Sequence, residues 1–277
     1  MSTLVKILAA VAGVYLLVAL VMYMGQRRLM YFPDARHTLP AQAGLSNVSE
    51  RLLNTPDGAR IVAWYGKAKP GQPTLLYFHG NGGGLADRAE RFRRFMGQGW
   101  GVYMMAYRGY AGSTGYPTEA NNIADARLAY DALVREGVPA GSVILYGESL
   151  GTNVAARMAA EKDAAGLILE APYTSVLDIA LSDYPFLPVR LLLSDRYETD
   201  KVIAKVRVPL LILHGKQDDI IPVSMAHKLA KLANEPKRVV ILPEAEHSDL
   251  YLEGNNALPV VRDWIRGLGR RASGTKE

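Results

Sequence analysis

The chain has 277 residues and carries 32 Lys and Arg against 27 Asp and Glu, so its formal net charge is only +5. This near balance excludes a strongly basic nucleic-acid-binding protein, and no nucleic-acid partner is expected. Hydrophobic residues make up 49% and charged residues 21%, which suits a buried core and excludes a disordered chain. The lack of Cys excludes disulfides, iron–sulfur clusters, thiolate zinc sites and a cysteine nucleophile.

The first predicted element is an uncharged apolar segment, Ile7–Met24. As a helix it measures about 27 Å, which is close to the hydrocarbon thickness of a bilayer. Arg27 and Arg28 end the apolar run, and the flank lacks the small residues of a signal-peptide cleavage site. We therefore predict a membrane anchor in residues 1–28, with a cleaved signal peptide as the alternative. The flanking charges leave the side of the membrane undecided.

A linker and then a folded domain are predicted after this segment. Residues 29–46 contain Pro33 and Pro40 and show no apolar periodicity, which is typical of a linker. The domain is predicted to span residues 47–277. It begins with two β-rich runs on either side of the turn signal Pro56-Asp57-Gly58, which indicates an antiparallel hairpin at a sheet edge.

Beyond this hairpin (Val48–Asn54 and Arg60–Tyr65), short apolar runs alternate with amphipathic, helix-length segments. The alternation predicts an α/β fold with about eight strands in one mostly parallel sheet and helices on both faces. The other strands are predicted at Thr74–Phe78, Val102–Tyr107, Val143–Tyr146, Gly166–Glu170, Pro209–Leu213 and Val239–Leu242. The helices are predicted near Gly84–Met96, Pro117–Arg135, Ser149–Ala160, Val223–Ala233 and Ala257–Gly267. Residues 173–205 interrupt the pattern and predict a cap insertion above the strand ends.

The pentapeptide Gly147-Glu148-Ser149-Leu150-Gly151 directly follows a predicted strand and directly precedes a predicted helix. Its glycines allow the tight turn that lifts a serine hydroxyl above the sheet, and the following helix points its first N–H groups at that position. The context therefore predicts Ser149 as a nucleophile, and an ordinary Gly/Ser turn is the alternative.

A serine hydroxyl needs a base within hydrogen-bond reach and a carboxylate that orients the base. Among the five histidines, His247 follows the last predicted strand, where a base can reach over the C-terminal edge of the sheet. Asp218 and Asp219 follow the preceding strand; we favour Asp218, but spacing does not exclude its neighbour. The order serine, aspartate, histidine is the one expected of a serine hydrolase on such a sheet.

Acyl transfer also needs donors for the oxyanion, each worth about 3 kcal/mol. The backbone N–H of Leu150 is one candidate, and that of Asn81, in the glycine-rich loop His79–Gly84, is the other. Phosphate binding is the competing use of such a loop, but no Gly-Lys-Ser/Thr follows and Leu85 occupies the last glycine position of a dinucleotide motif. We predict no cofactor and no metal site.

Taken in order, these motifs resemble the α/β-hydrolase superfamily, and within it the membrane-anchored bud-emergence-type serine hydrolases, which are related to depalmitoylating α/β-hydrolases. The resemblance extends over nearly the whole chain. It rests on Arg28-Leu29-Met30-Tyr31-Phe32-Pro33, Phe78-His79-Gly80-Asn81, Tyr107-Arg108-Gly109-Tyr110, Gly112-Ser113, Gly147–Gly151, Tyr184-Pro185-Phe186-Leu187-Pro188 and His214-Gly215-Lys216-Gln217-Asp218.

The resemblance implies the α/β-hydrolase fold and a catalytic domain in residues 47–277. It implies that Ser149 is the nucleophile, Asp218 the acid and His247 the base. Two positions depart from the family pattern. Ala106 stands where relatives have aspartate, which alters the support of the following loop, and Glu246 stands where they have glycine, which predicts a raised imidazole pKa.

The sequence as a whole predicts a membrane-anchored serine hydrolase that cleaves carboxylic esters or thioesters. The apolar run Tyr184–Leu193 in the cap suggests an acyl-chain pocket, and hence a lipid or acyl-protein substrate as a hypothesis. An acyltransferase or a serine peptidase on the same three residues, and a non-catalytic membrane scaffold, are the alternatives. The acyl group, the leaving group and the oligomeric state are not predicted.

Overall fold

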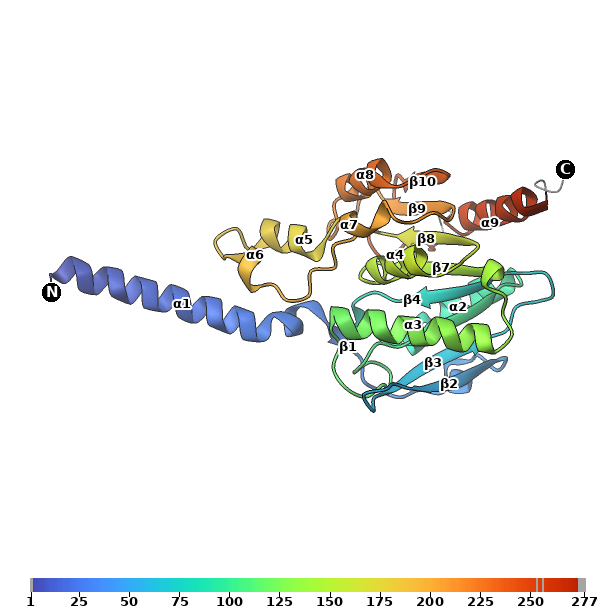
Figure 1. Cartoon of the computed structure of the whole chain (residues 1–277), viewed down its shortest axis with the longest axis horizontal. Coiled ribbons are helices and arrows are strands. Elements are labelled where there is room, and N and C mark those ends of the chain that lie inside the picture. Colours follow the sequence, from blue (N-terminus) through green and yellow to red (C-terminus); the bar gives the residue numbers. More distant parts are fainter. Residues whose placement is uncertain (1, 253, 256, 274–277) are drawn as a thin grey trace.

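The computed structural model describes residues 2–252, 254–255 and 257–273, and it shows an open sheet between helices with one long N-terminal helix projecting from it (Figure 1). Residues 274–277, the end of the predicted domain, lie outside the described residues. The main sheet has eight strands in the order β10-β9-β8-β7-β4-β6-β3-β2. Their bounds are β2 (Val48–Asn54), β3 (Arg60–Gly66), β4 (Thr74–Phe78), β6 (Gly101–Met105), β7 (Val143–Glu148), β8 (Gly166–Glu170), β9 (Leu210–Gly215) and β10 (Lys237–Leu242).

The strand directions confirm the predicted, mostly parallel sheet. β2 pairs antiparallel with β3, and β3 pairs antiparallel with β6, whereas all other neighbours in this sheet are parallel. The predicted hairpin therefore forms one edge. Every residue of β4, β6, β8 and β9 is buried, because helices cover both faces of these central strands. This burial explains why the four strands read as continuous apolar runs instead of alternating ones.

Helices cover both faces of the sheet, as predicted. Tyr77 and Tyr146 are register partners on β4 and β7, and both rings pack against Phe95 of α2. Gly147, the next residue on β7, lies instead against the start of α4. Since successive side chains of a strand point to opposite faces, α2 and α4 lie on opposite sides of the sheet. The helices that cover the sheet are α2 (Ala89–Gly97), α3 (Glu119–Arg135), α4 (Gly151–Glu161), α8 (Val223–Leu232) and α9 (Ala257–Ser273).

A cap of three short helices lies between β8 and β9 in the chain, within the predicted insertion. These helices are α5 (Val176–Asp183), α6 (Val189–Leu192) and α7 (Asp200–Ile203). Ser175 caps the first of them, because its hydroxyl accepts a hydrogen bond from the Asp178 N–H at 2.9 Å. Leu177, Leu187 and Val189 of the cap are buried in a small cluster of their own, separate from the main core.

The N-terminal helix α1 (Thr3–Met30) extends away from the domain, and its last turns lie beside the cap (Figure 1). Of the helices in the described ranges, it alone is long and apolar enough to span a membrane. The helix continues two residues beyond the predicted end of the anchor. Ala19, on its cap-facing side, belongs to the cap cluster, whereas Leu16 is 65% exposed.

The segment between α1 and the sheet is tied to the domain by backbone pairing. Its strand β1 (Phe32–Pro33) pairs in parallel with β5 (Gly82–Gly83), which lies in the glycine-rich loop after β4. Tyr31 and Leu45 are buried in the main core. Residues 29–46 are predicted to be a linker because they show no apolar periodicity. Apolar periodicity indicates helices and strands with a buried face, but it does not indicate backbone pairing of two residues or burial of single side chains.

Candidate active site

The nucleophile predicted from sequence lies on a sharp turn between β7 and α4. Ser149 has a φ of 49°, in the left-handed region that few residues other than glycine adopt. Its backbone N–H donates to the Glu170 carbonyl at 2.9 Å, which fixes the turn against the neighbouring strand. The two glycines of the motif are required by space: a side chain at Gly147 would collide with the Gly151 backbone, and one at Gly151 with the Phe78 carbonyl. The strained turn therefore lifts the hydroxyl above the strand ends.

The structure brings the three residues of the predicted triad into one hydrogen-bonded chain. His247 Nε2 lies 3.0 Å from Ser149 Oγ, and His247 Nδ1 lies 2.8 Å from Asp218 Oδ2. The three residues follow the ends of β7, β9 and β10, in that order. In the chain, 98 positions separate the serine from the histidine. Parallel strands end at the same edge of the sheet, so the topology places all three side chains together.

Asp218 is held rigidly, and the adjacent carboxylate is not. Oδ1 of Asp218 accepts the backbone N–H groups of Ile220 at 3.0 Å and Ile221 at 2.7 Å, which leaves Oδ2 for His247. Burial alone would raise the pKa of Asp218, but the hydrogen bonds from two histidines and from Ile221 outweigh it and lower the pKa well below its ordinary value. Asp219 is exposed to solvent, and the hydrogen bond to His247 comes from Asp218. The geometry therefore favours the first aspartate of the pair.

The surroundings of His247 favour the protonated form of its imidazole. Burial opposes the charge on the ring, but the hydrogen bond to Asp218 and the negative charges of Asp218, Glu170 and Glu148 outweigh burial and raise the pKa of His247. The expected contribution of Glu246 is not among these causes. Its side chain is exposed, so water screens its charge. The pKa is raised as predicted from the sequence, but by other carboxylates.

The two predicted oxyanion donors line the same cavity as Ser149. The Asn81 carbonyl accepts hydrogen bonds from the Phe32 N–H at 2.9 Å and from the Tyr110 hydroxyl at 2.7 Å, and its side-chain amide donates to the Met30 carbonyl at 2.9 Å. Within the described ranges, the backbone N–H groups of Asn81 and Leu150 donate to no protein acceptor. Both donors therefore remain available to a ligand above the serine.

The loop that carries Asn81 is oriented by His79. Burial, together with the charge of Arg88, lowers the pKa of His79 to about 3, so the ring is neutral at physiological pH. Nε2 accepts the Tyr107 N–H at 3.3 Å, and the other ring nitrogen, Nδ1, therefore carries the proton and donates to the Gly80 carbonyl at 2.7 Å. The histidine thus joins the loop to the end of β6.

Two partly buried ion pairs near the turn were not identified from sequence. Arg88 donates to both oxygens of Glu148 at 3.3 Å and to the Gly84 carbonyl at 3.1 Å, so it joins the residue before the nucleophile to the glycine-rich loop. Arg91 pairs with the fully buried Glu170 at 2.5 Å and also lies over a tyrosine ring. The sequence signal of such a pair is Glu148, the acidic residue before the serine. Its partner, Arg88, lies 60 positions earlier in the chain.

The loop after β6 is held in place by Asp125 and Asp57, and not by the residue at position 106. Arg108 is bidentate to Asp125, at 2.8 and 2.9 Å, and to Asp57, at 2.6 and 3.0 Å. The alanine at position 106 is therefore compatible with an ordered loop.

Across the part of the chain that the structure describes, no group of three His, Asp or Glu side chains is arranged to hold a metal ion.

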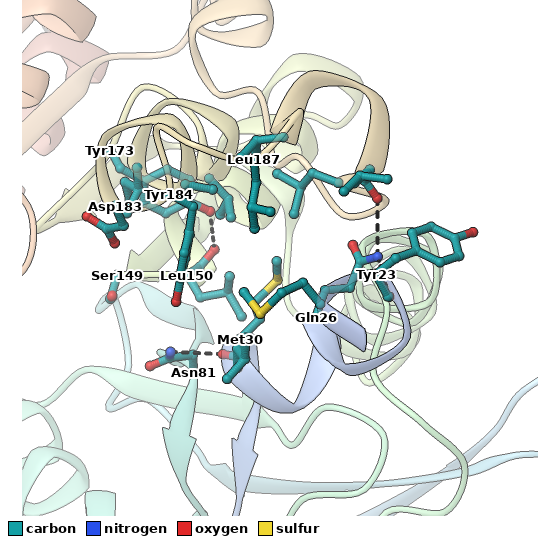
Figure 2. A pocket seen from close by; sticks show the side chains of 18 residues that line it. Tyr23, Gln26, Met30, Asn81, Ser149, Leu150, Tyr173, Asp183, Tyr184 and Leu187 are labelled. Carbon is teal, nitrogen blue, oxygen red and sulfur yellow. Dashed lines mark hydrogen bonds between the residues drawn. The ribbon is translucent and has the colours of Figure 1, made fainter. Parts of the chain in front are cut away.

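A mostly apolar cavity of about 230 Å³ opens at the serine, between the cap and α1. Figure 2 shows Ser149 at one end, Met30, Gln26 and Tyr23 of α1 along one side, and Leu187 of the cap on the other. The apolar run of the cap that was expected to form a pocket floor contributes Tyr184, Leu187, Val189, Leu192 and Leu193. The contribution of α1 was not anticipated.

Comparison with known proteins gives the family. The sequence pattern of the family described as serine aminopeptidase, S33, matches residues 69–192. The chain is 36% identical to the uncharacterized protein Rv2307c of Mycobacterium tuberculosis over 94% of each chain. It is 32% identical to the α/β-hydrolase domain-containing protein WAV2 of Arabidopsis thaliana, over 88% of this chain and 86% of that one. The chain belongs to the α/β-hydrolase superfamily.

Solved structures agree with the fold of this α/β-hydrolase. The Pyrococcus furiosus esterase Pf2001 superposes with a TM-score of 0.68 at 18% identity, over 86% of this chain and 98% of that one. An α/β-hydrolase from Vibrio vulnificus superposes with a TM-score of 0.67 at 21% identity, over 85% and 89% of the two chains. The α/β-hydrolase superfamily and the fold expected from the sequence motifs are therefore confirmed.

Proposed function

We propose that this α/β-hydrolase is a membrane-anchored serine hydrolase that cleaves carboxylic esters or thioesters through an acyl-enzyme intermediate. The observation that carries the proposal is the hydrogen-bonded chain from Ser149 through His247 to Asp218, with separations of 3.0 and 2.8 Å, at the mouth of an apolar cavity. A serine, a histidine and an aspartate in this relation are the parts that nucleophilic acyl transfer requires.

In the proposed acylation step, Ser149 Oγ attacks the acyl carbon while His247 Nε2 takes the hydroxyl proton. Asp218 stabilises the imidazolium that forms and keeps Nδ1 protonated. The N–H groups of Asn81 and Leu150 then donate to the oxygen that gains negative charge. His247 returns the proton to the departing alcohol or thiol, and the acyl group stays on the serine as an ester.

Deacylation repeats the same proton transfers with water. His247 accepts a proton from water as the water oxygen attacks the acyl carbon, and the proton then passes to Ser149 Oγ as the ester bond breaks. The raised pKa of His247 suits the second half of each step, in which the imidazolium is the acid. The products are the carboxylic acid and the free enzyme.

The proposal includes retention of α1 as a membrane anchor. Most of the helix presents apolar side chains to the surroundings: Leu4, Val11 and Leu16 are each more than 60% exposed. Exposed apolar surface of this extent is costly in water and favourable in a bilayer. Cleavage after such a helix, as for a signal sequence, would strip away Met22, Gln26 and other residues of the cavity wall. Resistance of the full-length chain to extraction from membranes by alkaline carbonate tests the anchor.

A fluorophosphonate probe tests the chemistry, because it labels only a serine that an adjacent base has activated. We expect the full-length chain to be labelled and Ser149→Ala to remain unlabelled, with parallel loss of p-nitrophenyl ester hydrolysis. Thr152→Ala is the matched control, since its hydroxyl donates to the Ser149 carbonyl instead of facing the base. An unlabelled wild-type protein would support a non-catalytic scaffold instead.

Peptidase activity is the second candidate, because the matching family pattern is described as a serine aminopeptidase. An aminopeptidase must bind a charged α-amine, and the cavity beside the serine is lined mainly by apolar side chains. The carboxylate among the lining residues, Asp183, is exposed to solvent, so water screens its charge. We therefore expect p-nitrophenyl esters to be cleaved and aminoacyl p-nitroanilides to be left intact. An acyltransferase uses the same residues and is distinguished by product analysis in the presence of added alcohols or amines.

A further inference from the structure

We infer that helix α1 is part of the substrate site: its last turns form a wall of the acyl-chain pocket, and Met22 limits the length of the chain that the pocket encloses. This inference rests on the proposed ester or thioester hydrolase activity and adds the substrate class, a linear fatty-acyl group. It assigns to the anchor a role that anchoring by itself does not require.

The cavity that begins at the serine is enclosed on one side by α1. Of its 18 lining residues, five belong to this helix: Met22, Tyr23, Gln26, Leu29 and Met30. From the last to the first of these is a rise of about 12 Å along the helix axis. The cavity therefore extends along α1 for about two turns, from the reacting centre toward the apolar part of the helix (Figure 2).

One face of α1 is built to stay against the cap. Tyr15 donates through its hydroxyl to the Phe186 carbonyl at 3.0 Å. One turn later, Ala19 is buried against Leu187 and other cap residues. Two turns after that, Gln26 donates to the Leu192 carbonyl at 3.2 Å. The spacings of four and seven residues correspond to about one and two helical turns, so the three contacts lie on one face of the helix.

The last turn of this face is fixed by charge. Arg27 Nε lies 2.9 Å from Asp195 Oδ2, and the same carboxylate accepts the Tyr31 hydroxyl at 3.2 Å. The side chain of Asp195 is only 6% exposed, so loss of Arg27 would leave a buried carboxylate without its cation. Together with the backbone pairing of Phe32 to Gly82, these contacts hold the helix end beside the oxyanion loop. The wall is therefore a fixed part of the site.

The lining favours an apolar occupant, and the length of the cavity along α1 favours an unbranched one. Met22, Leu29 and Met30 of the helix line the cavity together with Ile179 and Leu187 of the cap. An engineered protein cavity of about 150 Å³ holds the six carbons of benzene, so in proportion 230 Å³ holds roughly nine carbons. We therefore expect acyl chains of about eight to ten carbons to be fully enclosed. Longer chains would extend past Met22 along the lipid-facing part of α1.

The test compares two tryptophan substitutions at neighbouring positions of α1. In Met22→Trp the larger ring fills the cavity, whereas in Val21→Trp it replaces a side chain that is 59% exposed and lines no part of the cavity. The full-length proteins are assayed in detergent micelles with p-nitrophenyl esters of two to sixteen carbons. The readout is the ratio of kcat/KM for octanoate to kcat/KM for acetate.

We expect Met22→Trp to lower this ratio at least about tenfold and Val21→Trp to leave it at the wild-type value, because a rigid pocket rejects extra methylene groups. An unchanged ratio in Met22→Trp, or an equal fall in Val21→Trp, would overturn the role of α1. Fluorophosphonate labelling of each variant at Ser149 reports whether the site is folded. If Met22→Trp is not labelled, Met22→Ala decides: a longer preferred chain supports the inference, and an unchanged preference overturns it.

Failure of the underlying function has a different signature. A wild-type protein that is neither labelled by the fluorophosphonate nor active on any ester overturns the hydrolase itself. A wild-type protein that is labelled and hydrolyses acetate, but gains nothing from longer chains, overturns only the acyl pocket along α1.

Discussion

Replacing Asp218 by asparagine is a direct test of the proposed chemistry, because the fold dictates how the new amide must lie. Oδ1 of Asp218 accepts two backbone N–H groups, at 3.0 and 2.7 Å, so the amide oxygen has to occupy that position. The amide NH₂ then takes the place of Oδ2, 2.8 Å from His247 Nδ1. An NH₂ group donates, so the ring must accept at Nδ1 and carry its proton on Nε2, where it can no longer take a proton from Ser149.

The size of the effect follows from two losses. The charge-assisted hydrogen bond to the imidazolium is worth about 1.5–3 kcal/mol, or roughly 10- to 150-fold in rate. The wrong tautomer adds to this loss, and the corresponding substitution in a well-studied triad lowers kcat about 10⁴-fold. We therefore expect Asp218→Asn to lower kcat/KM for p-nitrophenyl esters by about 10³- to 10⁴-fold. The amide is isosteric and keeps both backbone hydrogen bonds, so the protein should stay folded.

Asp219→Asn is the matched control. It removes the same charge from the next residue, whose side chain is exposed. It should leave kcat/KM within about twofold of the wild type, because an exposed charge is screened by water. Steady-state kinetics on the full-length proteins, with thermal denaturation to verify folding, provide the measurement. Retention of more than a tenth of wild-type activity by Asp218→Asn, or equal losses in both variants, would refute the reasoning.

Three further outcomes are expected. The base acts when neutral and the pKa of His247 is raised, so kcat/KM should increase with pH and reach half its maximum above about pH 6.5; a midpoint clearly below that value contradicts the assignment. Asn81→Ala keeps the backbone donor but loses the side-chain bond that holds its loop, so kcat should fall about tenfold with KM little changed, and a change in KM alone would argue against an oxyanion role. Arg91→Met leaves the buried carboxylate of Glu170 without its cation and should lower the free energy of unfolding by about 3–5 kcal/mol, against less than about 1 kcal/mol for the exposed Arg93→Met; equal values in denaturant titrations would contradict this.

Much of the fold was predictable because its signals are local. The hairpin strand Val48–Asn54 and the strands Thr74–Phe78 and Gly166–Glu170 have in the structure the bounds predicted for them. Periodicity, turn residues and run length report on neighbours within a few positions, and such neighbours decide whether a segment is a strand or a helix. The predicted strands and helices differ from the structure mainly at their ends, as in α9, which continues six residues beyond Gly267. The short strands β1 and β5 and the helices of the cap were not predicted.

The candidate site was predictable only in part. Ser149 carries its own local context, since the strand, the glycines and the helix adjoin it in the chain. The choice between Asp218 and Asp219 has no local signal, because side chains of adjacent loop residues point in different directions. It is decided in the structure by the N–H groups of Ile220 and Ile221, which hold one carboxylate toward His247.

The sequence by itself determined the order of strands and helices, the sharp turn at Ser149 and the apolar character of the first helix, because each depends on residues close together in the chain. Only the tertiary structure decided what that helix does next to the cap. Gln26 meets Leu192 across 166 positions, and Arg27 meets Asp195 across 168. No periodicity within either segment encodes such pairings, since they arise when the sheet brings the cap and the helix end to the same edge.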